Sequence, residues 1–142
     1  DITKLATLTG IARTTILAYL QYLHEAKLIR LLYSDDLSVK KMQKPDKILM
    51  ENTNLLQALS LQVPNIGTMR ETFFCNQLGY THQVEYNKRG DYLIDHKYVF
   101  EIGGKAKDGK QVANMENAYI ASDECDYPIG NKLPLWLFGL MY

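Results

Sequence analysis

Residues 90–105, with the sequence GDYLIDHKYVFEIGGK, constrain the fold of this chain more than any other stretch. Two short apolar runs, at 92–94 and 98–102, flank three polar residues, a pattern that predicts two β-strands joined by a tight turn. Asp91 stands at the start of the first strand, and Glu101 stands near the end of the second, shortly before Lys105. The stretch therefore predicts a hairpin that carries two carboxylates and a lysine.

The composition predicts a folded protein with one sizeable domain or two small ones. The chain has 142 residues, of which 46% are hydrophobic and 23% are charged, enough apolar side chains to bury a core. The sequence has no apolar run near the ~20 residues that span a bilayer, so we expect no membrane partner. A chain that starts at Asp1 with no secretory signal and contains two isolated cysteines is expected to be a cytoplasmic piece of something longer.

Charge is distributed unevenly although the formal net charge is zero. Residues 1–50 contain eight Lys and Arg against five Asp and Glu, and the remainder contains eight against eleven. This split indicates a first half that faces nucleic acid and a second half that carries acids.

The first thirty residues have the pattern of a helix-turn-helix. A short helix is predicted at 3–8 and a longer one at 12–26, with Gly10 able to adopt the left-handed conformation that ends a helix. In a helix-turn-helix the start of the second helix reaches base edges or phosphates. The candidate DNA-binding residues on this helix are Arg13, Thr14, Thr15 and Gln21.

Two strands predicted at 28–33 and 46–51 would form a hairpin after these helices. The polar loop between them carries Lys40, Lys41 and Lys44, which are candidates for contacts with DNA phosphates. A helix-turn-helix followed by a hairpin with a basic tip is a winged helix, here assigned to residues 1–51. Winged helices also serve as packing units between domains, and a lysine-rich loop is often only a solvated loop.

The second half has the order of an α/β protein. We expect a linker helix within 52–66, a helix at 69–78 that contains Glu71, and a strand at 83–86 before the hairpin. A helix is predicted at 111–120, and the apolar run at 134–142 has the length of a buried strand. Residues 67–142 are therefore predicted to form a mixed sheet flanked by helices.

Three acids and a lysine in this half are candidates for catalysis: Glu71, Asp91, Glu101 and Lys105. Hydrolysis of a phosphodiester with Mg²⁺ requires carboxylate ligands, and Asp91 with Glu101 are the candidate metal ligands. Other roles stay open for each residue. Glu71 has the position to interact with a helix N-terminus, Asp91 with a turn, and Glu101 with Lys105 in a surface ion pair.

Several spaced segments resemble one family over nearly the whole chain. They are residues 5–20, 44–47, Gly67 with Glu71, 90–94, 100–105 and 134–139. Together they resemble the C-terminal region of a large group of prokaryotic AAA-type ATPases, in which a winged helix precedes a PD-(D/E)XK nuclease-like domain of unassigned function. The resemblance implies DNA as a partner and an ATPase module before Asp1 that would bind ATP, and it leaves homo-oligomers open.

The chain departs from the family pattern at one position. The family lysine usually follows the acid by two residues, where this chain has Gly103, and Lys105 lies about 6–7 Å further along a strand. Two functions therefore remain open: a DNA-associated accessory region that cleaves DNA, and a non-catalytic interaction module with the same fold. A transcriptional regulator is disfavoured because it gives the 91–105 layout no purpose.

Overall fold

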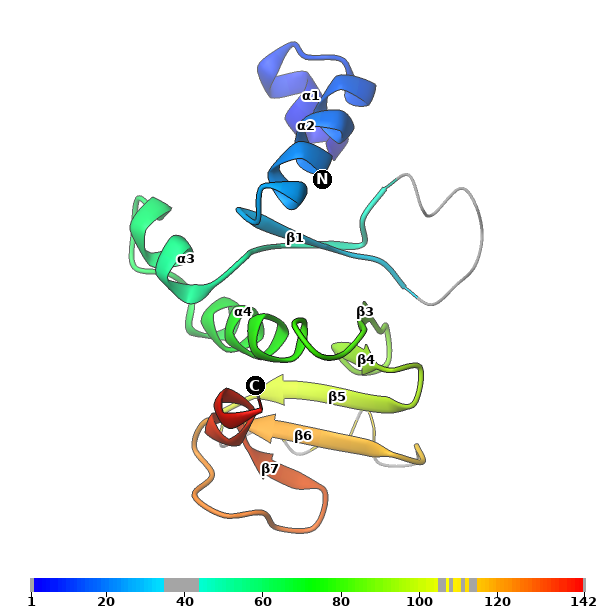
Figure 1. The fold of residues 1–142 in the computed structure, drawn as a ribbon, viewed down its shortest axis with the longest axis vertical. Helices are drawn as coiled ribbons and strands as arrows, with labels where there is room; N and C mark the ends of the chain where they lie inside the picture. The colour runs from blue at the N-terminus through cyan, green and yellow to red at the C-terminus, as the bar shows by residue number, and fades with distance from the viewer. Residues whose placement is uncertain are drawn as a thin grey trace.

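The computed structural model describes residues 2–34, 44–104, 107, 109–110, 112 and 115–141. The chain is a mixed α/β protein, as the sequence predicted, with a five-stranded sheet flanked by helices (Figure 1). Within these residues, no helix combines the length and the apolar character needed to cross a lipid bilayer.

The N-terminal part contains two helices and a two-stranded antiparallel sheet. Helices α1 (Ile2–Thr9) and α2 (Arg13–Glu25) are joined at Gly10, which has a φ of 69°, the left-handed conformation expected there. Strands β1 (Ile29–Leu32) and β2 (Lys47–Met50) pair in the register Ile29↔Met50. The predicted order of helix, turn, helix and hairpin is therefore confirmed, and Lys40 and Lys41 lie outside the described residues.

The larger sheet has the order β3-β4-β5-β6-β7. Its strands are β3 (Val84–Tyr86), β4 (Tyr92–Ile94), β5 (Tyr98–Gly103), β6 (Ala118–Ser122) and β7 (Lys132–Pro134). The first three strands are antiparallel, whereas β5, β6 and β7 run parallel. The β4–β5 turn has positive φ at Asp95 and His96, and Lys97 N–H donates to the Ile94 carbonyl oxygen at 3.0 Å. Because Ile94 pairs with Tyr98, three residues, 95–97, form this tight turn.

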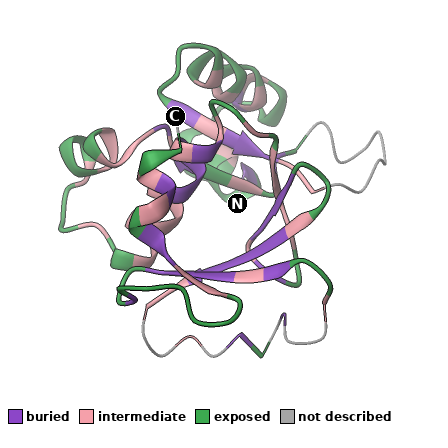
Figure 2. Ribbon diagram, turned by 60° about the horizontal axis from the view of Figure 1, so that its bottom comes forward, coloured by how far each residue is buried: buried purple, intermediate pink, exposed green. Residues whose placement is uncertain are grey.

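One core joins the N-terminal hairpin to the larger sheet. Helix α4 (Ile66–Leu78) and the 3₁₀ helix η1 (Leu135–Leu140) cover one face of this sheet, and its strands are largely buried (Figure 2). Leu32 from β1 and Leu49 from β2 belong to the same cluster of buried residues as Phe74 of α4 and Tyr92 of β4. The core therefore crosses the boundary that the sequence placed at residue 51.

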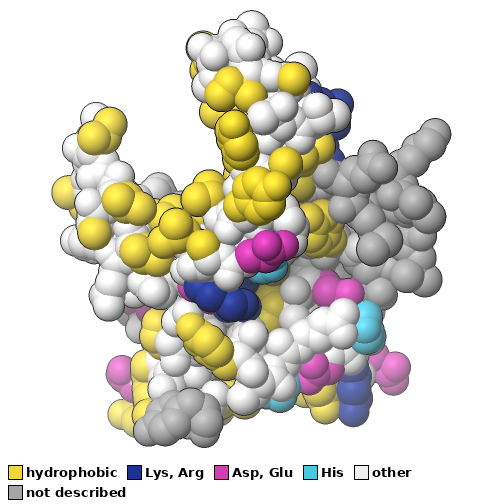
Figure 3. All heavy atoms as spheres, turned by 45° about the horizontal axis from the view of Figure 1, so that its top comes forward, with side chains coloured by type: hydrophobic (Ala, Val, Ile, Leu, Met, Phe, Trp, Pro, Cys, Tyr) yellow, Lys and Arg dark blue, Asp and Glu magenta, His cyan; other side chains and the backbone are white. Residues whose placement is uncertain are grey.

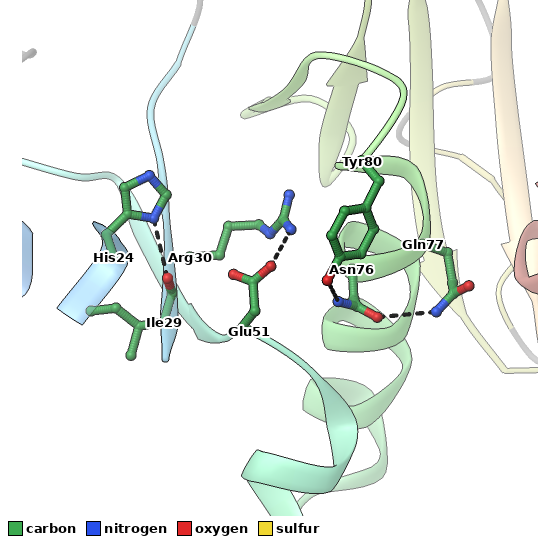
Figure 4. Close-up of polar contacts among 7 residues, drawn as sticks. All are labelled: His24, Ile29, Arg30, Glu51, Asn76, Gln77 and Tyr80. Carbon is green, nitrogen blue, oxygen red and sulfur yellow. Dashed lines mark hydrogen bonds and ion pairs between the residues drawn. The ribbon is translucent and has the colours of Figure 1, made fainter. Parts of the chain in front are cut away.

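Polar contacts reinforce this junction. Tyr86 N–H donates to the Tyr33 carbonyl oxygen at 2.8 Å, so the end of β1 lies beside the end of β3. Arg30 of β1 forms an ion pair with Glu51, with 2.6 Å between Nη2 and Oε1 (Figure 4). The Glu51 side chain is buried and the Arg30 side chain is 12% exposed. A Cβ placed on Gly79 would lie 1.5 Å from Nη1 of Arg30, so the guanidinium packs directly against the C-terminal end of α4.

Two predicted elements differ in the structure. Residues 118–120, expected at the end of a helix, belong to strand β6, because Ala118 and Ile120 are buried on one face of the sheet. The run at 134–142 was expected to be a strand, but β7 ends at Pro134 and η1 follows. The helix expected within 52–66 is present as α3 (Thr53–Leu59), which ends before α4 begins at Ile66.

Candidate functional site

Asp91 is held at the mouth of the β4–β5 hairpin by two hydrogen bonds. Its backbone N–H donates to the Phe100 carbonyl oxygen at 2.8 Å, and its Oδ2 accepts from the Ile102 N–H at 2.6 Å. The Asp91 carboxylate thus accepts the hydrogen bond of the Ile102 N–H at the end of the β4–β5 pairing, where a backbone carbonyl would otherwise accept it. Gly90 permits this close approach, because a Cβ there would lie 2.8 Å from the Phe100 carbonyl oxygen.

Glu101 is a buried carboxylate near the end of β5. Only 2% of its surface is exposed, although it lies on β5 between the apolar residues Phe100 and Ile102. Its Oε1 lies 3.1 Å from the Lys107 Nζ, whereas its Oε2 has no hydrogen-bond partner among the described residues. A buried charged oxygen without a partner is costly, so this atom is a natural point for a bound cation or water.

Lys107 reaches Glu101 across the space that Gly103 leaves open. A Cβ placed on Gly103 would lie 2.9 Å from Cβ, Cγ and Cδ of Lys107, so the lysine stem lies directly over this glycine. Lys107 was not among the residues predicted from the sequence, and the predicted Lys105 lies outside the described residues. The available signal was the glycine pair 103–104, which leaves the strand face open to a lysine from the following loop.

Ser122 lies next to this pair. It is fully buried, it stands opposite Gly103 in the parallel pairing of β5 and β6, and its Oγ has no partner among the described residues. Side chains alternate along a strand, and Val99, Ala118 and Ile120 pack together below the sheet. Glu101 and Ser122 therefore share this lower face, at the carboxyl ends of two parallel strands, where ligands bind in many α/β proteins.

Glu71 is separated from this cluster. It lies on α4, above the other face of the sheet, and its Oε1 is 2.8 Å from the Lys47 Nζ of β2. Burial raises the pKa of the Tyr92 hydroxyl above its ordinary value, and the neighbouring Cys75 and Glu71 act in the same direction. In the described part of the chain, no three His, Cys, Asp or Glu side chains are grouped to hold a metal, so Glu71 does not complete a three-ligand set with Asp91 and Glu101.

An open cleft of about 540 Å³ lies beside Lys107. Gly67 and Arg70 of α4 line one side of it, and Gly103 and Gly104 line another. Arg70 is oriented by Asp123, with 2.6 Å between Nε and Oδ2. The cleft therefore gives a solvent-borne ligand access to the lysine that pairs with Glu101.

A magnesium ion is compatible with the donors at this edge. Mg²⁺ prefers hard oxygen ligands and is commonly bound by one or two carboxylates with waters completing its octahedron. Donors of this kind are the Asp91 carboxylate and the Glu101 Oε2, for which the described part of the chain supplies no hydrogen-bond partner. Asp91 and Glu101 thus stay the predicted metal ligands, and the lysine that lies beside Glu101 is Lys107.

The N-terminal helices present part of the predicted DNA-binding set to solvent. Arg13 and Thr14 are exposed at the start of α2, and Thr15 is half-buried. Gln21 is exposed, and its side-chain amide donates to Glu25 Oε1 at 3.1 Å within the same helix. Lys44 is exposed at the start of the chain leading into β2.

Comparisons with protein-family models, with curated protein sequences and with solved structures found no match for this chain. The function is therefore argued from the site itself.

Proposed function

We propose that this chain is a DNA-associated accessory region of an AAA-type ATPase, in which a winged-helix head binds DNA and a nuclease-like domain hydrolyses phosphodiesters. One observation carries the proposal: a buried Glu101 lies beside Asp91 and an open cleft, with one oxygen paired with Lys107 and the other without a hydrogen-bond partner among the described residues. The arrangement of the spaced segments that resemble this ATPase group supports the same function.

Each residue has a defined chemical role in this proposal. Glu101 and Asp91 hold the metal, which when bound supplies a Lewis acid and an activated water. Lys107 keeps a positive charge at the mouth of the cleft, where it stabilises the negative charge that develops on the phosphoryl oxygens. Hydrolysis adds one water to phosphorus and breaks one P–O bond, with the proton passing to the leaving oxygen.

The test is cleavage of linear DNA by the purified chain over a Mg²⁺ titration. We expect cleavage that Glu101→Gln abolishes, because the amide keeps the shape of the side chain and removes its charge. Glu116→Gln is the matched control, since Glu116 is an exposed glutamate on the turn before β6. Cleavage that persists in Glu101→Gln would reject the proposed site.

The alternative is a non-catalytic module that uses the same fold to bind the ATPase or another protein. It is favoured by the apolar surface that α3 and the chain after it expose to solvent. The salt dependence of DNA binding distinguishes the two functions, because contacts with phosphates weaken steeply as the salt concentration rises. DNA binding that is absent, or that does not respond to salt, favours the interaction module.

A further inference from the structure

Arg70 of α4 carries hydrogen-bond donors that the described part of the chain does not use. A guanidinium has five N–H donors in a fixed, planar arrangement. The Arg70 Nε donates to the Asp123 Oδ2 at 2.6 Å, whereas its two terminal nitrogens form no hydrogen bond with the described residues. The side chain is only 16% exposed and lines the open cleft beside Lys107. Asp123 therefore fixes a guanidinium whose other donors remain for a ligand in this cleft.

Two adjacent glycines make room for two cations at the cleft. A Cβ placed on Gly104 would lie between 3.0 and 3.2 Å from the Nη2, Cζ and Nη1 atoms of Arg70, so the guanidinium packs against this glycine. The Lys107 stem lies over Gly103 in the same way. A guanidinium and an ammonium beside one cleft suit a phosphate group, because arginine binds two phosphate oxygens at once and lysine acts as a point charge.

Three carboxylates lie near these cations. Glu101 pairs with Lys107, and Asp123 orients Arg70 through its Nε. Glu124 lies at the cleft as well, with 3.6 Å between its Oε1 and the Arg70 Nη2, which is longer than a hydrogen bond. The Glu124 side chain is 55% exposed, so water screens its charge. A phosphate oxygen would therefore replace a weak contact at Nη2.

The cleft differs in charge from the surface that precedes it along the chain. Residues 52–69 contain no Asp, Glu, Lys or Arg. Hydrophobic side chains gather on the α3 lobe, which this segment forms (Figure 3). Arg70 is the first charged residue after this segment, and it is directed to the cleft and not to the apolar lobe. Positive charge is thus concentrated where the glycines leave space.

We propose that this cleft binds the phosphate group of a nucleotide unit between Arg70 and Lys107. The two terminal nitrogens of Arg70 donate to two oxygens of the phosphate, and the Lys107 ammonium approaches a third. The cleft volume of about 540 Å³ lies within the ~300–1,000 Å³ usual for small-ligand sites. This inference rests on the proposed function for its class of ligand, but it concerns binding alone and requires neither metal nor cleavage.

Isothermal titration calorimetry of the whole chain in EDTA tests the proposal with three probes. Thymidylyl-(3′→5′)-thymidine carries a phosphodiester, thymidine 5′-monophosphate carries a monoester, and thymidine carries no phosphate. We expect a phosphate-bearing probe to bind more tightly than thymidine, and Arg70→Gln to weaken that binding about tenfold or more. Tighter binding of the diester assigns the site to the DNA backbone, and tighter binding of the monoester assigns it to a free nucleotide or a DNA end.

A second variant separates ligand binding from a structural role of Arg70. Glu124→Gln keeps the Arg70–Asp123 pair and removes a negative charge near Nη2, so we expect about two- to fivefold tighter binding of phosphate. A purely structural Arg70 predicts no such gain. Lys97→Gln is the matched control, because Lys97 is an exposed cation at the other end of β5 from Gly103. It is expected to bind like the unmodified chain.

Two results would overturn the inference. One is a chain that binds neither phosphate probe more tightly than thymidine, and the other is phosphate binding that Arg70→Gln leaves unchanged. These outcomes are distinct from failure of the proposed function. A chain that binds phosphate through Arg70 but never cleaves DNA rejects the hydrolysis alone, and a chain that cleaves DNA without Arg70-dependent phosphate binding rejects this inference alone.

Discussion

The Lys107 ammonium lies 3.1 Å from the Glu101 carboxylate and reaches it across Gly103. The lysine comes from the loop after β5, whereas the glutamate comes from the strand itself. The glycine is the reason that the two meet, since any side chain at 103 would occupy the path of the lysine stem. The buried Glu101 carboxylate is thus paired with Lys107, a residue that lies outside strand β5.

Moving this lysine along the chain tests its role. Lys107→Ala is expected to lower the rate of DNA cleavage by about 10²–10³-fold, the usual effect of removing one group that stabilises developing charge. Adding Gly103→Lys to that variant is expected to restore part of the rate, because the new side chain enters the space that the old one left. Cleavage rates at fixed Mg²⁺ measure both.

The control for this pair is Lys88→Ala, which removes an exposed lysine from the turn before β4. An unmodified chain without cleavage rejects the nuclease function itself. Cleavage that is equal in the unmodified chain and in Lys107→Ala rejects only the role of the lysine.

Gly90→Ala is expected to disturb the start of the hairpin. The new Cβ would lie 2.7 Å from Val99 Cγ1 and 2.8 Å from the Phe100 carbonyl oxygen, so the backbone must shift. Overpacking of this kind costs about 1–3 kcal/mol, and we expect that loss in the free energy of unfolding. Urea denaturation measures it, with Gly130→Asn as a control, because a Cβ at Gly130 meets open space and Asn tolerates positive φ. Equal stability of the two variants would contradict the close approach.

Removing one partner of the Arg30–Glu51 pair is expected to destabilise the protein more than removing both. Arg30→Ala leaves the Glu51 carboxylate buried without its cation, which costs about 3–5 kcal/mol in comparable pairs. The double variant Arg30→Met with Glu51→Leu removes both charges and fills the space with apolar groups. We expect it to recover most of the loss in urea denaturation, and a double variant as unstable as the single one would argue against the pair.

Exposed cations on the N-terminal part are expected to bind DNA phosphates. Arg13→Ala and Lys44→Ala should each weaken binding to all sequences alike and reduce the slope of log affinity against log salt by about 0.9 per lost contact. Fluorescence anisotropy over a salt series measures this. Lys97→Ala is the control, because Lys97 lies over the Tyr98 ring, 4.8 Å from its centroid, on the larger sheet. If only Lys97→Ala changed the slope of log affinity against log salt, the DNA would be bound at the larger sheet and not at the N-terminal part.

Stability is expected to fall at alkaline pH through Cys75. Burial raises the pKa of its thiol to about 12, so the folded protein holds this proton more tightly than the unfolded chain, whose thiol titrates near 9.0. The contribution is complete below pH 9 and is lost as the pH rises toward 12. Cys75→Ala is expected to flatten this part of a plot of melting temperature against pH. An unchanged curve would show that the thiol does not titrate with folding.

Short-range features of this protein were predictable from its sequence. The hairpin at 92–103 followed from two apolar runs around a polar turn, and the left-handed Gly10 followed from its place after a helix. These features depend on side-chain alternation and on steric limits at single residues, which act within a few positions of the chain. Asp91 and Glu101 were placed on neighbouring strands for the same reason.

Tertiary packing decided the rest. Residues 111–120 have a helical spacing of apolar side chains at Val112, Met115 and Tyr119, which predicted a helix. The parallel edge of β5 offers residues 118–120 backbone partners and a buried face, so these residues form part of β6. Glu71 was a candidate for the same site as Asp91 and Glu101, yet it lies on the other side of the sheet in an ion pair with Lys47. Lys107 and Ser122 join Glu101 only because a loop folds back and a parallel strand aligns. Sequence spacing sets local conformation, whereas contacts between distant residues are set by which surfaces the whole chain can bury together.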